Sequence, residues 1–191
     1  MKDEKIEIAS LAGGCFWCTE AVFERLKGVT KVISGFTGGT IKNPAYREII
    51  TGRTGHAEAV EIHFNPEIIS FEELLYIFFS VHDPTTLNRQ QFDVGTQYRS
   101  AIFYHSEVQK ETALKVIERL EMEKVFDAPI VTEITAATSF YTAEPEHKEY
   151  YSKHREQQYC QVIIDPKIKK LKELFSEKLK NLICLYFYKF C

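Results

Sequence analysis

Residues 6–28 read IEIASLAGGCFWCTEAVFERLKG and hold the signals that decide the fold. The apolar-rich run Ile6–Ala12 ends at two glycines and predicts a strand. From Cys15 to Lys27 the apolar residues recur at helical spacing, and Gly28 is a stop signal. The stretch therefore predicts a strand joined to a helix by a glycine turn, with Cys15 in the first turn of the helix.

Similar patterns continue along the chain. Further strands are predicted at residues 29–36, 57–64, 99–104 and 130–136. Further helices are predicted at 71–81 and 107–124 behind the N-caps Ser70 and Ser106, at 165–181, and in part at 46–52 and 144–159. The polar stretch 82–97 lacks periodicity and is longer than most connections, which is typical of functional loops.

This order of elements predicts an α+β fold. We expect a single-domain two-layer sandwich with a split βαβ (ferredoxin-like) core. The domain would span residues 1–164, and residues 165–191 would form a C-terminal helical extension and tail packed on it. The pattern gives no account of the apolar tail 182–191.

Composition narrows the class of protein. The chain has 191 residues, 45% of them hydrophobic and 27% charged, with a net charge of −3. These values exclude disordered chains and a general attraction to nucleic acid or anionic membrane. No apolar run approaches the roughly 20 residues that span a bilayer, and residues 1–5 lead into the first strand without a signal peptide. We expect a cytoplasmic monomer.

The chain has five cysteines: Cys15, Cys18, Cys160, Cys184 and Cys191. An odd number without a secretion signal is not typical of a disulfide scaffold. Cys15 stands where unpaired N–H groups and the helix dipole favour a thiolate, so its pKa is expected to be lowered. Cys18 follows three residues later on the same helix face.

Other interpretations of Cys15 and Cys18 stay open. They could be a buried structural pair, half of a zinc site, or a thioredoxin-type dithiol. A zinc site needs two more ligands, and the sequence has no second CxxC or HxxxH. The two preceding glycines favour close backbone approach, and thus a reactive cysteine. Trp17, the only tryptophan, could line a slot for a small apolar group or be a core residue.

Several blocks in order resemble the peptide methionine sulfoxide reductase A family, which acts on the S epimer of methionine sulfoxide. The first block is Gly14-Cys15-Phe16-Trp17. The others are Asn43–Arg47, Thr54–Val60, His82–Pro84, Asp93–Ser100 and Phe140–His147. Together they extend from about Ile8 to Cys160.

The resemblance implies a role for each matched residue. Cys15 matches the nucleophile, and Glu58 matches the acid that protonates the sulfoxide oxygen. The remaining matches are Tyr46 and Tyr98 as hydroxyls that hold this oxygen, Phe16 and Trp17 as the wall around the substrate methyl, and Asp93 as a polar lining residue. The family implies no metal and no organic cofactor.

The chemistry of a sulfoxide agrees with these roles. Thiolate attack on its sulfur requires the oxygen to be protonated or strongly hydrogen-bonded. Glu58 must therefore hold a proton near neutral pH, and we expect burial to raise its pKa. Without the resemblance, Glu58 would be interpreted as an ordinary solvated residue and the two tyrosines as packing residues. Asp93 would be interpreted as a residue that caps or fixes the long loop. His56 is expected to be structural.

A second thiol must then resolve the sulfenic acid formed on Cys15. Cys160 matches the usual resolving position, although a lysine-rich helix replaces the glycine-rich tail of many members. Cys18 is the second candidate, strained if the helix stays intact, and an external thiol is the third route. Cys184 and Cys191 rank last.

The leading hypothesis is a reductase of free and protein-bound methionine S-sulfoxide that repairs oxidised proteins. Its reductant would be thioredoxin, glutaredoxin or a similar thiol donor. A general disulfide oxidoreductase using Cys15 and Cys18 would not need Glu58. A redox-sensing or zinc-holding module without turnover is the non-enzymatic alternative.

Overall fold

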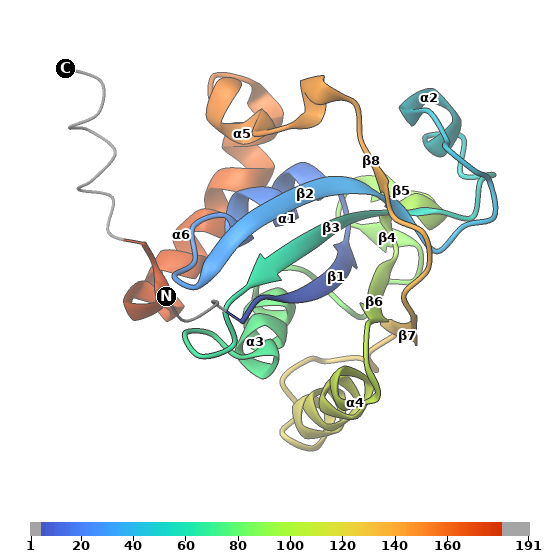
Figure 1. The fold of residues 1–191 in the computed structure, drawn as a ribbon. Coiled ribbons are helices and arrows are strands. Elements are labelled where there is room, and N and C mark those ends of the chain that lie inside the picture. The colour runs from blue at the N-terminus through green and yellow to red at the C-terminus, as the bar shows by residue number, and fades with distance from the viewer. Residues whose placement is uncertain (1–4, 181–191) are drawn as a thin grey trace.

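The computed structural model describes residues 5–180, and a six-stranded mixed sheet forms its centre (Figure 1). The strands lie in the order β7-β6-β1-β3-β2-β8, and all neighbours are antiparallel except β6 and β7. The strands are β1 (Glu7–Gly13), β2 (Val29–Thr37), β3 (Ala57–Phe64), β6 (Ser100–Tyr104), β7 (Glu133–Ala136) and β8 (Tyr141–Thr142). The predicted α+β class is confirmed, and β8 is a strand that the sequence pattern does not predict.

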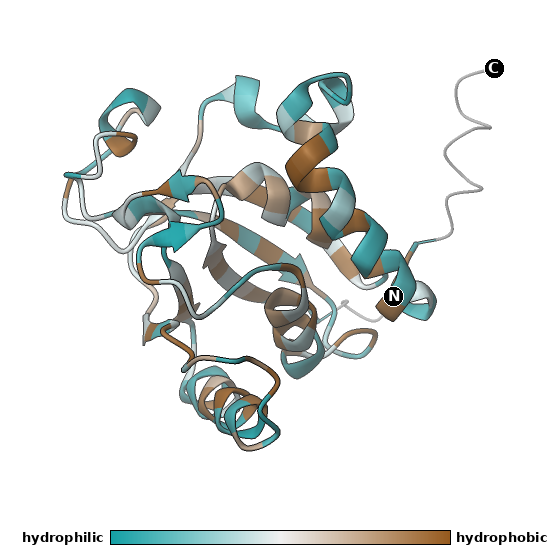
Figure 2. Cartoon of the chain, turned by 180° about the vertical axis from the view of Figure 1, so that it is seen from behind, coloured by the Kyte–Doolittle hydropathy of each residue, from teal (hydrophilic) through white to brown (hydrophobic). Residues whose placement is uncertain are grey.

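Helices cover one face of this sheet. They are α1 (Phe16–Phe23), α3 (Phe71–Val81) and α6 (Asp165–Leu174), which lie towards the viewer in Figure 2. α4 (Glu107–Met122) packs against α3 and the β6–β7 edge. The shorter pieces are α2 (Tyr46–Ile49), α5 (Tyr150–Lys153), the 3-10 turns η1 (Thr96–Tyr98), η2 (Pro145–His147) and η4 (Ser176–Lys178), and the π-helical turn η3 (Cys160–Ile164). Within residues 5–180, no helix combines the length and the apolar character that a membrane crossing needs.

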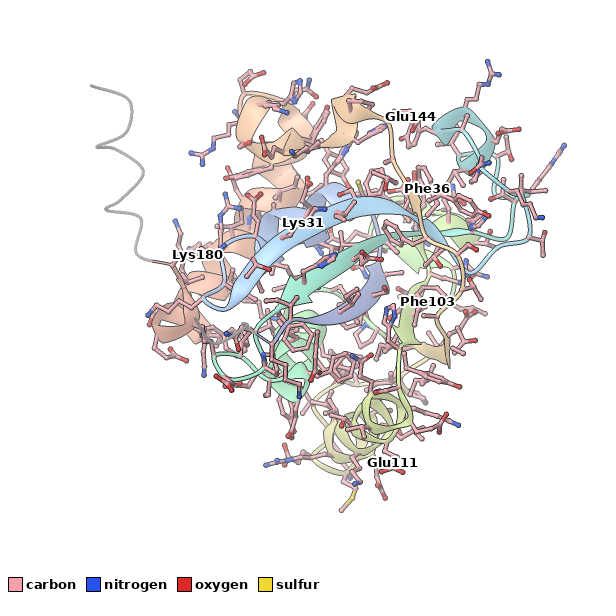
Figure 3. All side chains as sticks on the ribbon, in the orientation of Figure 1. Lys31, Phe36, Phe103, Glu111, Glu144 and Lys180 are labelled. Atoms are coloured by element: carbon pink, nitrogen blue, oxygen red, sulfur yellow. The ribbon has the colours of Figure 1, made fainter. Side chains whose placement is uncertain are left out.

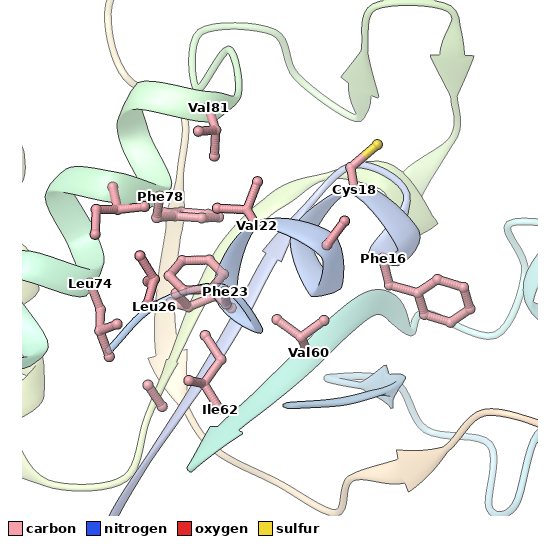
Figure 4. Close-up of a cluster of buried hydrophobic side chains, with 14 of the residues drawn as sticks. Phe16, Cys18, Val22, Phe23, Leu26, Val60, Ile62, Leu74, Phe78 and Val81 are labelled. Atoms are coloured by element: carbon pink, nitrogen blue, oxygen red, sulfur yellow. The ribbon is translucent and has the colours of Figure 1, made fainter. Parts of the chain in front are cut away.

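The main core lies between the helices and the sheet (Figure 4). Its most deeply buried members come from α1, β3 and α3, and they include Val22, Phe23, Val60, Ile62, Leu74 and Phe78. Burying a side chain of this size contributes about 1.5–3 kcal/mol. The core therefore fixes α1 on the sheet, and with it the position of the helix N-terminus that follows β1.

The helix starts predicted from serine caps are confirmed. Ser70 Oγ accepts a hydrogen bond from Glu73 N, and the Glu73 carboxylate accepts one from Ser70 N at 2.8 Å. Ser106 Oγ likewise accepts from Gln109 N at 3.2 Å. These caps satisfy N–H groups that have no partner inside the helix.

Two predicted helix ends are wrong for one shared reason. α1 ends at Phe23 and α6 at Leu174, short of the predicted Lys27 and Asn181. Beyond these ends the two segments pair with each other. Lys27 N donates to Lys178 O and Lys180 N donates to Arg25 O, each at 2.8 Å. Tertiary pairing thus replaces the last helical turns.

The predicted loop 82–97 is more ordered than its sequence indicates. It contains the two-stranded hairpin of β4 (Arg89–Gln90) and β5 (Asp93–Val94), followed by the start of η1. The tail 182–191, with Cys184 and Cys191, lies outside the described residues.

Candidate active site around Cys15

Cys15 stands at the junction between β1 and α1. It is the N-cap residue of α1 and is only 7% exposed. Gly14 has a φ of +88°, and a Cβ there would lie 2.6 Å from Gln90 Cγ. A Cβ on Gly13 would lie 2.8 Å from the Phe78 ring. The glycine pair therefore lets the backbone bend sharply and bring Cys15 under the β4–β5 hairpin, as close backbone approach requires.

Glu58 lies in β3 and is almost fully buried. Its Oε2 accepts a hydrogen bond from Phe16 N at 3.2 Å, and no described residue within hydrogen-bonding distance partners Oε1. Burial raises the pKa of this carboxyl to about 8, and the charge of Asp93 adds to the rise. Glu58 therefore holds its proton near neutral pH, as predicted, with one oxygen free for a substrate.

Tyr46 and Tyr98 come from distant segments but lie near the same carboxyl. Tyr46 is the first residue of α2, and Tyr98 is the last of η1. Burial, followed by the charge of Glu58, raises the pKa of each half-buried phenol. Tyr46 N donates to Glu144 Oε1 at 2.8 Å, and Figure 3 shows Glu144 beside α2. Because their pKa values are raised, the phenols of Tyr46 and Tyr98 remain neutral and can donate hydrogen bonds.

Phe16 and Trp17 form the aromatic side of the site. The Phe16 ring is buried and lies 5.3 Å from the His147 ring and 6.5 Å from the Tyr46 ring, between ring centroids. Trp17 stacks on Tyr150, with 3.6 Å between ring centroids and an interplanar angle of 5°. Trp17 Nε1 donates to His147 Nδ1 at 3.3 Å. The wall is rigid because each ring has an aromatic neighbour.

Asp93 is held by a residue that the sequence analysis did not single out. Tyr159 Oη donates to Asp93 Oδ2 at 2.8 Å and lies 3.8 Å from Cys18 Sγ. Tyr159 thus connects the hairpin with the thiols. His147, Tyr150 and Tyr159 were all missed, and the only signal for them was the abundance of Tyr and His in residues 144–159.

The two thiols of the CxxC segment have opposite electrostatic environments. Burial raises the pKa of Cys15 well above its ordinary value, and its hydrogen bond with Cys18 and the charge of Glu58 add to the rise. The same hydrogen bond lowers the pKa of Cys18, and so does the charge of buried Lys167. The prediction of a lowered pKa for Cys15 is therefore wrong for the resting site, because burial outweighs the helix terminus.

Cys160 lies at the start of the π-helical turn η3 and is fully buried. Burial raises the pKa of Cys160, and the charges of Asp165 and Cys18 raise it further. Cys15, Cys18 and Cys160 are all free thiols.

The other histidines near the site have structural contacts. His56 Nδ1 accepts from Gly39 N at 3.1 Å, and His56 Nε2 lies 2.8 Å from Ile41 O. His82 bridges Phe78 O and Ser100 Oγ, and burial lowers its pKa to about 3. Among residues 5–180 there is no group of three or more His, Cys, Asp or Glu side chains that could hold a metal ion.

Comparisons with known proteins agree with this geometry. A family model described as peptide methionine sulfoxide reductase matches residues 7–179. The Chromobacterium violaceum protein named peptide methionine sulfoxide reductase MsrA is 52% identical over 176 residues, which cover 92% of this chain and all of that protein.

Solved structures are similar as well. Reduced Mxr1 from Saccharomyces cerevisiae is 32% identical with a TM-score of 0.75, and the match covers 83% of this chain and 91% of Mxr1. Mxr1 in complex with Trx2 is 25% identical with a TM-score of 0.53, and that match covers 78% of this chain and 87% of Mxr1.

Proposed function

Because the chain belongs to the peptide methionine sulfoxide reductase A family and reduces methionine S-sulfoxide in proteins, we propose that the site around Cys15 performs this reaction. Cys15 is the nucleophile and Glu58 the acid. Tyr46 and Tyr98 hold the sulfoxide oxygen, and Phe16 and Trp17 surround the substrate methyl. Asp93 is a polar residue that lines the site.

The observation that carries this proposal is the state of Glu58. A buried carboxyl with a pKa of about 8 is mostly protonated at neutral pH, and its Oε1 has no partner among the described residues. It can therefore donate to an oxygen that gains negative charge, which is the need of a sulfoxide under attack. The phenols of Tyr46 and Tyr98 supply further donors that stay neutral.

The proposed step balances without a cofactor. Glu58 protonates the sulfoxide oxygen and, as a carboxylate, takes the proton of the nearby Cys15 thiol, whose neighbour Phe16 donates its N–H to Glu58 Oε2. Cys15 Sγ attacks the substrate sulfur and forms a bond to it. The protonated oxygen then passes from the substrate sulfur to Sγ, so that the Sγ–O bond forms while the bonds from the substrate sulfur to Sγ and to this oxygen break. Methionine is released, reduced by two electrons, and Cys15 is oxidised to a sulfenic acid. Glu58 ends the step protonated again.

We propose Cys18 as the thiol that resolves this sulfenic acid. It lies in the first turn of α1, three residues after Cys15, and its lowered pKa gives it more thiolate. Since Cys15 is an N-cap with an extended ψ of 127°, bringing the two sulfurs together does not require breaking the helix interior. Attack of Cys18 forms the disulfide and releases water. Cys160, the first candidate from sequence, is the second in this ranking because burial raises its pKa, whereas the pKa of Cys18 is lowered.

We further propose that a thioredoxin or glutaredoxin-like dithiol reduces the resulting disulfide. The support is that Mxr1, a similar protein, has been crystallised with Trx2. Free methionine sulfoxide is a second proposed substrate. Three free thiols fit a reducing compartment, which supports a cytoplasmic site of action.

The arrangement of the central strands supports a split βαβ core. β6, β1, β3 and β2 are neighbours in that order, all pairs are antiparallel, and α1 and α3 connect strands of this set. This is the layout expected when two βαβ units interleave.

The alternatives from the sequence receive less support. A general disulfide oxidoreductase needs no buried protonated carboxyl beside its nucleophile, yet Glu58 occupies that place. A zinc-holding module needs a ligand cluster, and residues 5–180 contain none.

The test is an assay of the separate S and R epimers of N-acetyl-methionine sulfoxide, with dithiothreitol as reductant. Wild type is compared with Cys15→Ser, Glu58→Gln, Cys18→Ser and Cys160→Ser. We expect turnover of the S epimer only, abolished in Cys15→Ser and strongly reduced in Glu58→Gln. With thioredoxin as reductant, Cys18→Ser should lose more activity than Cys160→Ser, and the reverse order would make Cys160 the resolving thiol.

A further inference from the structure

Glu20 is a buried carboxyl that the proposed reaction does not use. It lies on α1 one turn after Trp17 and is only 4% exposed. Among residues 5–180, no Lys, Arg or His side chain forms an ion pair with it. Its Oε2 instead accepts a hydrogen bond from Glu149 N at 3.0 Å. Since a carboxyl is rarely buried without a partner, this contact identifies what Glu20 holds.

The partner of Glu20 belongs to the segment that supports Trp17. Residues 147–150 contact α1 at three points. Trp17 Nε1 donates to His147 Nδ1 at 3.3 Å, and Tyr150 stacks on the Trp17 ring with 3.6 Å between ring centroids. The hydrogen bond from Glu149 N to Glu20 lies between them in sequence. Because Trp17 and Glu20 are three residues apart on one helix, they share a face and contact adjacent residues of this segment.

Glu149 is the residue of this segment with an unfavourable backbone conformation. Its φ of +54° and ψ of +34° are left-handed, which is uncommon for a residue with a side chain. Such a conformation persists where the surrounding contacts hold it. Glu149 directly precedes Tyr150, the first residue of α5, and its own side chain makes no capping hydrogen bond. The hydrogen bond to Glu20 therefore fixes the turn that sets the position of the Tyr150 ring.

We propose that Glu20 is a positioning residue for the aromatic side of the site, because its carboxylate holds the turn at Glu149 and so keeps Tyr150 stacked on Trp17. This inference rests on the proposed function, in which Phe16 and Trp17 surround the substrate methyl. A ring that is already fixed by its neighbours offers this methyl a ready surface, whereas a mobile ring must be ordered when the substrate binds. Glu20 thus acts through Trp17 and not on the sulfoxide.

The charge of Glu20 makes this contact depend on pH. Burial raises the pKa of Glu20 to about 7, the hydrogen bond from Glu149 opposes this rise, and the charges of Glu24 and Glu149 add to it. The carboxylate accepts more strongly than the acid, and it is lost as the pH falls through this value. The ionisable groups that line the cavities beside Glu20 are Glu24 at the end of α1, Lys31 on β2, Glu144, His147, Lys148 and Glu149 on the segment before α5, and Lys180. Burial lowers the pKa of His147, so this ring titrates at a lower pH than Glu20.

The first test uses the fluorescence of Trp17, which is the only tryptophan of the chain. In wild type, the emission should shift to longer wavelength and acrylamide should quench it more strongly as the pH falls through about 7, because the stack on Tyr150 loosens. Glu20→Gln keeps an oxygen that can accept but cannot titrate, so this transition should be absent. Changes that both proteins share arise from other groups, such as His147 and Glu58.

The second test is turnover of N-acetyl-methionine S-sulfoxide with dithiothreitol at pH 7.5, where most of Glu20 is ionised. Glu20→Leu replaces the acceptor with an apolar side chain of similar size. We expect its KM to rise roughly tenfold while kcat stays within about twofold of wild type, because the wall contacts the substrate equally in the ground and transition states. Glu20→Gln should lie between the two proteins.

Glu24→Gln is the matched control. Glu24 is the C-cap residue of α1, and its carboxylate pairs with Arg25 at 2.6 Å and not with residues 147–150. The variant should keep the wild-type KM. Its fluorescence transition should move to lower pH, because a negative charge that raises the pKa of Glu20 is gone.

The outcomes separate this inference from the proposed function. If wild type and Glu20→Gln share the transition near pH 7, or if Glu20→Leu folds and keeps the wild-type KM, Glu20 does not position the wall. A fall in kcat with an unchanged KM would also overturn the inference. If Glu20→Leu does not fold, the fluorescence of wild type and Glu20→Gln decides. If wild type does not turn over N-acetyl-methionine S-sulfoxide, it is the proposed function that fails, and the fluorescence still tests Glu20.

Discussion

The two sides of the candidate site are built differently. On the sheet side, Cys15 follows the end of β1 and Glu58 lies at the start of the adjacent strand β3. Both are deeply buried and have few hydrogen bonds. On the other side, Asp93, Tyr98 and Tyr159 come from a hairpin, a 3-10 turn and the residue before a π-helical turn. There the side chains are half-buried, and Asp93 is tied to Tyr159.

This difference assigns different tasks to the two sides. Groups that must change charge stand on the buried side, where burial is the main cause of the raised pKa of Glu58. Groups that only donate or orient stand on irregular segments, where hydrogen bonds set their positions. Substitutions on the sheet side should therefore alter the chemical step most, and those on the irregular side progressively less.

The largest effect is expected for Glu58→Gln. The amide still accepts from Phe16 N but has no acidic proton to give. We expect kcat/KM for the S-sulfoxide to fall by about 10²–10⁴ at pH 7, which is the usual contribution of a general acid. Glu61→Gln, the same change three residues along β3, is the matched control and should keep its activity. Similar losses in both variants would refute the role of Glu58.

The next effect is expected for Tyr98→Phe, which removes a hydroxyl aimed at the sulfoxide oxygen. We expect a loss in kcat of about 10²-fold, by analogy with the loss of one donor to a developing oxyanion. Tyr46→Phe should behave similarly, and Tyr104→Phe on β6 is a control outside the site. A change confined to KM would mean that the hydroxyl only binds the substrate.

A smaller effect is expected on the irregular side for Tyr159→Phe. Loss of the 2.8 Å hydrogen bond leaves Asp93 free to move, and we expect a roughly tenfold fall in kcat/KM. Asp93→Ala combined with Tyr159→Phe should cost little more than the worse single variant, because both break one contact. Additive losses in this double-mutant cycle would show that the two residues act independently.

The smallest effect is expected for Lys167→Met, whose largest charge interaction is with the second thiol, Cys18. Lys167 Nζ donates to Val81 O at 2.6 Å. The pKa of Cys18 is lowered by Cys15, by the charge of Lys167 and by the hydrogen bond with Tyr159, whereas burial and the charge of Asp93 raise it. Loss of the charge should slow alkylation of Cys18 by a few-fold at pH 7, measured on the Cys18 peptide by mass spectrometry.

Two variants control this experiment. Lys167→Arg keeps a charge and should react like wild type, and the exposed Lys170→Met should have little effect. An unchanged alkylation rate in Lys167→Met would mean that the thiol hydrogen bond alone sets the reactivity of Cys18.

Local patterns predicted the parts of the fold that local interactions determine. Residues 57–64 form β3 as their alternation indicates, and the capping box at Ser70 starts α3. The early ends of α1 and α6 could not be predicted, since they depend on pairing between Arg25–Lys27 and Lys178–Lys180, about 150 residues away.

The candidate site divides in the same way. The glycine turn before Cys15 follows from residue types. The role of Glu58 came from the resemblance to the family, and its need for a proton from the chemistry of a sulfoxide. The raised pKa of Cys15 and the contact of Tyr159 with Asp93 follow from neither, because burial and a partner 66 residues away are tertiary properties. The resemblance therefore brought together Cys15 and Glu58 as candidate groups, whereas the contacts that hold the site had to come from the structure.

The most direct test of the account is the pH dependence of kcat/KM for N-acetyl-methionine S-sulfoxide, which reports on groups in the free enzyme. Wild type should lose activity as the pH rises through about 8, because Glu58 then gives up the proton that the reaction needs. Glu58→Gln should be slow and lack this decline. The same decline in both proteins, or a wild-type rate that keeps rising above pH 8, would contradict the assignment of Glu58 as the acid.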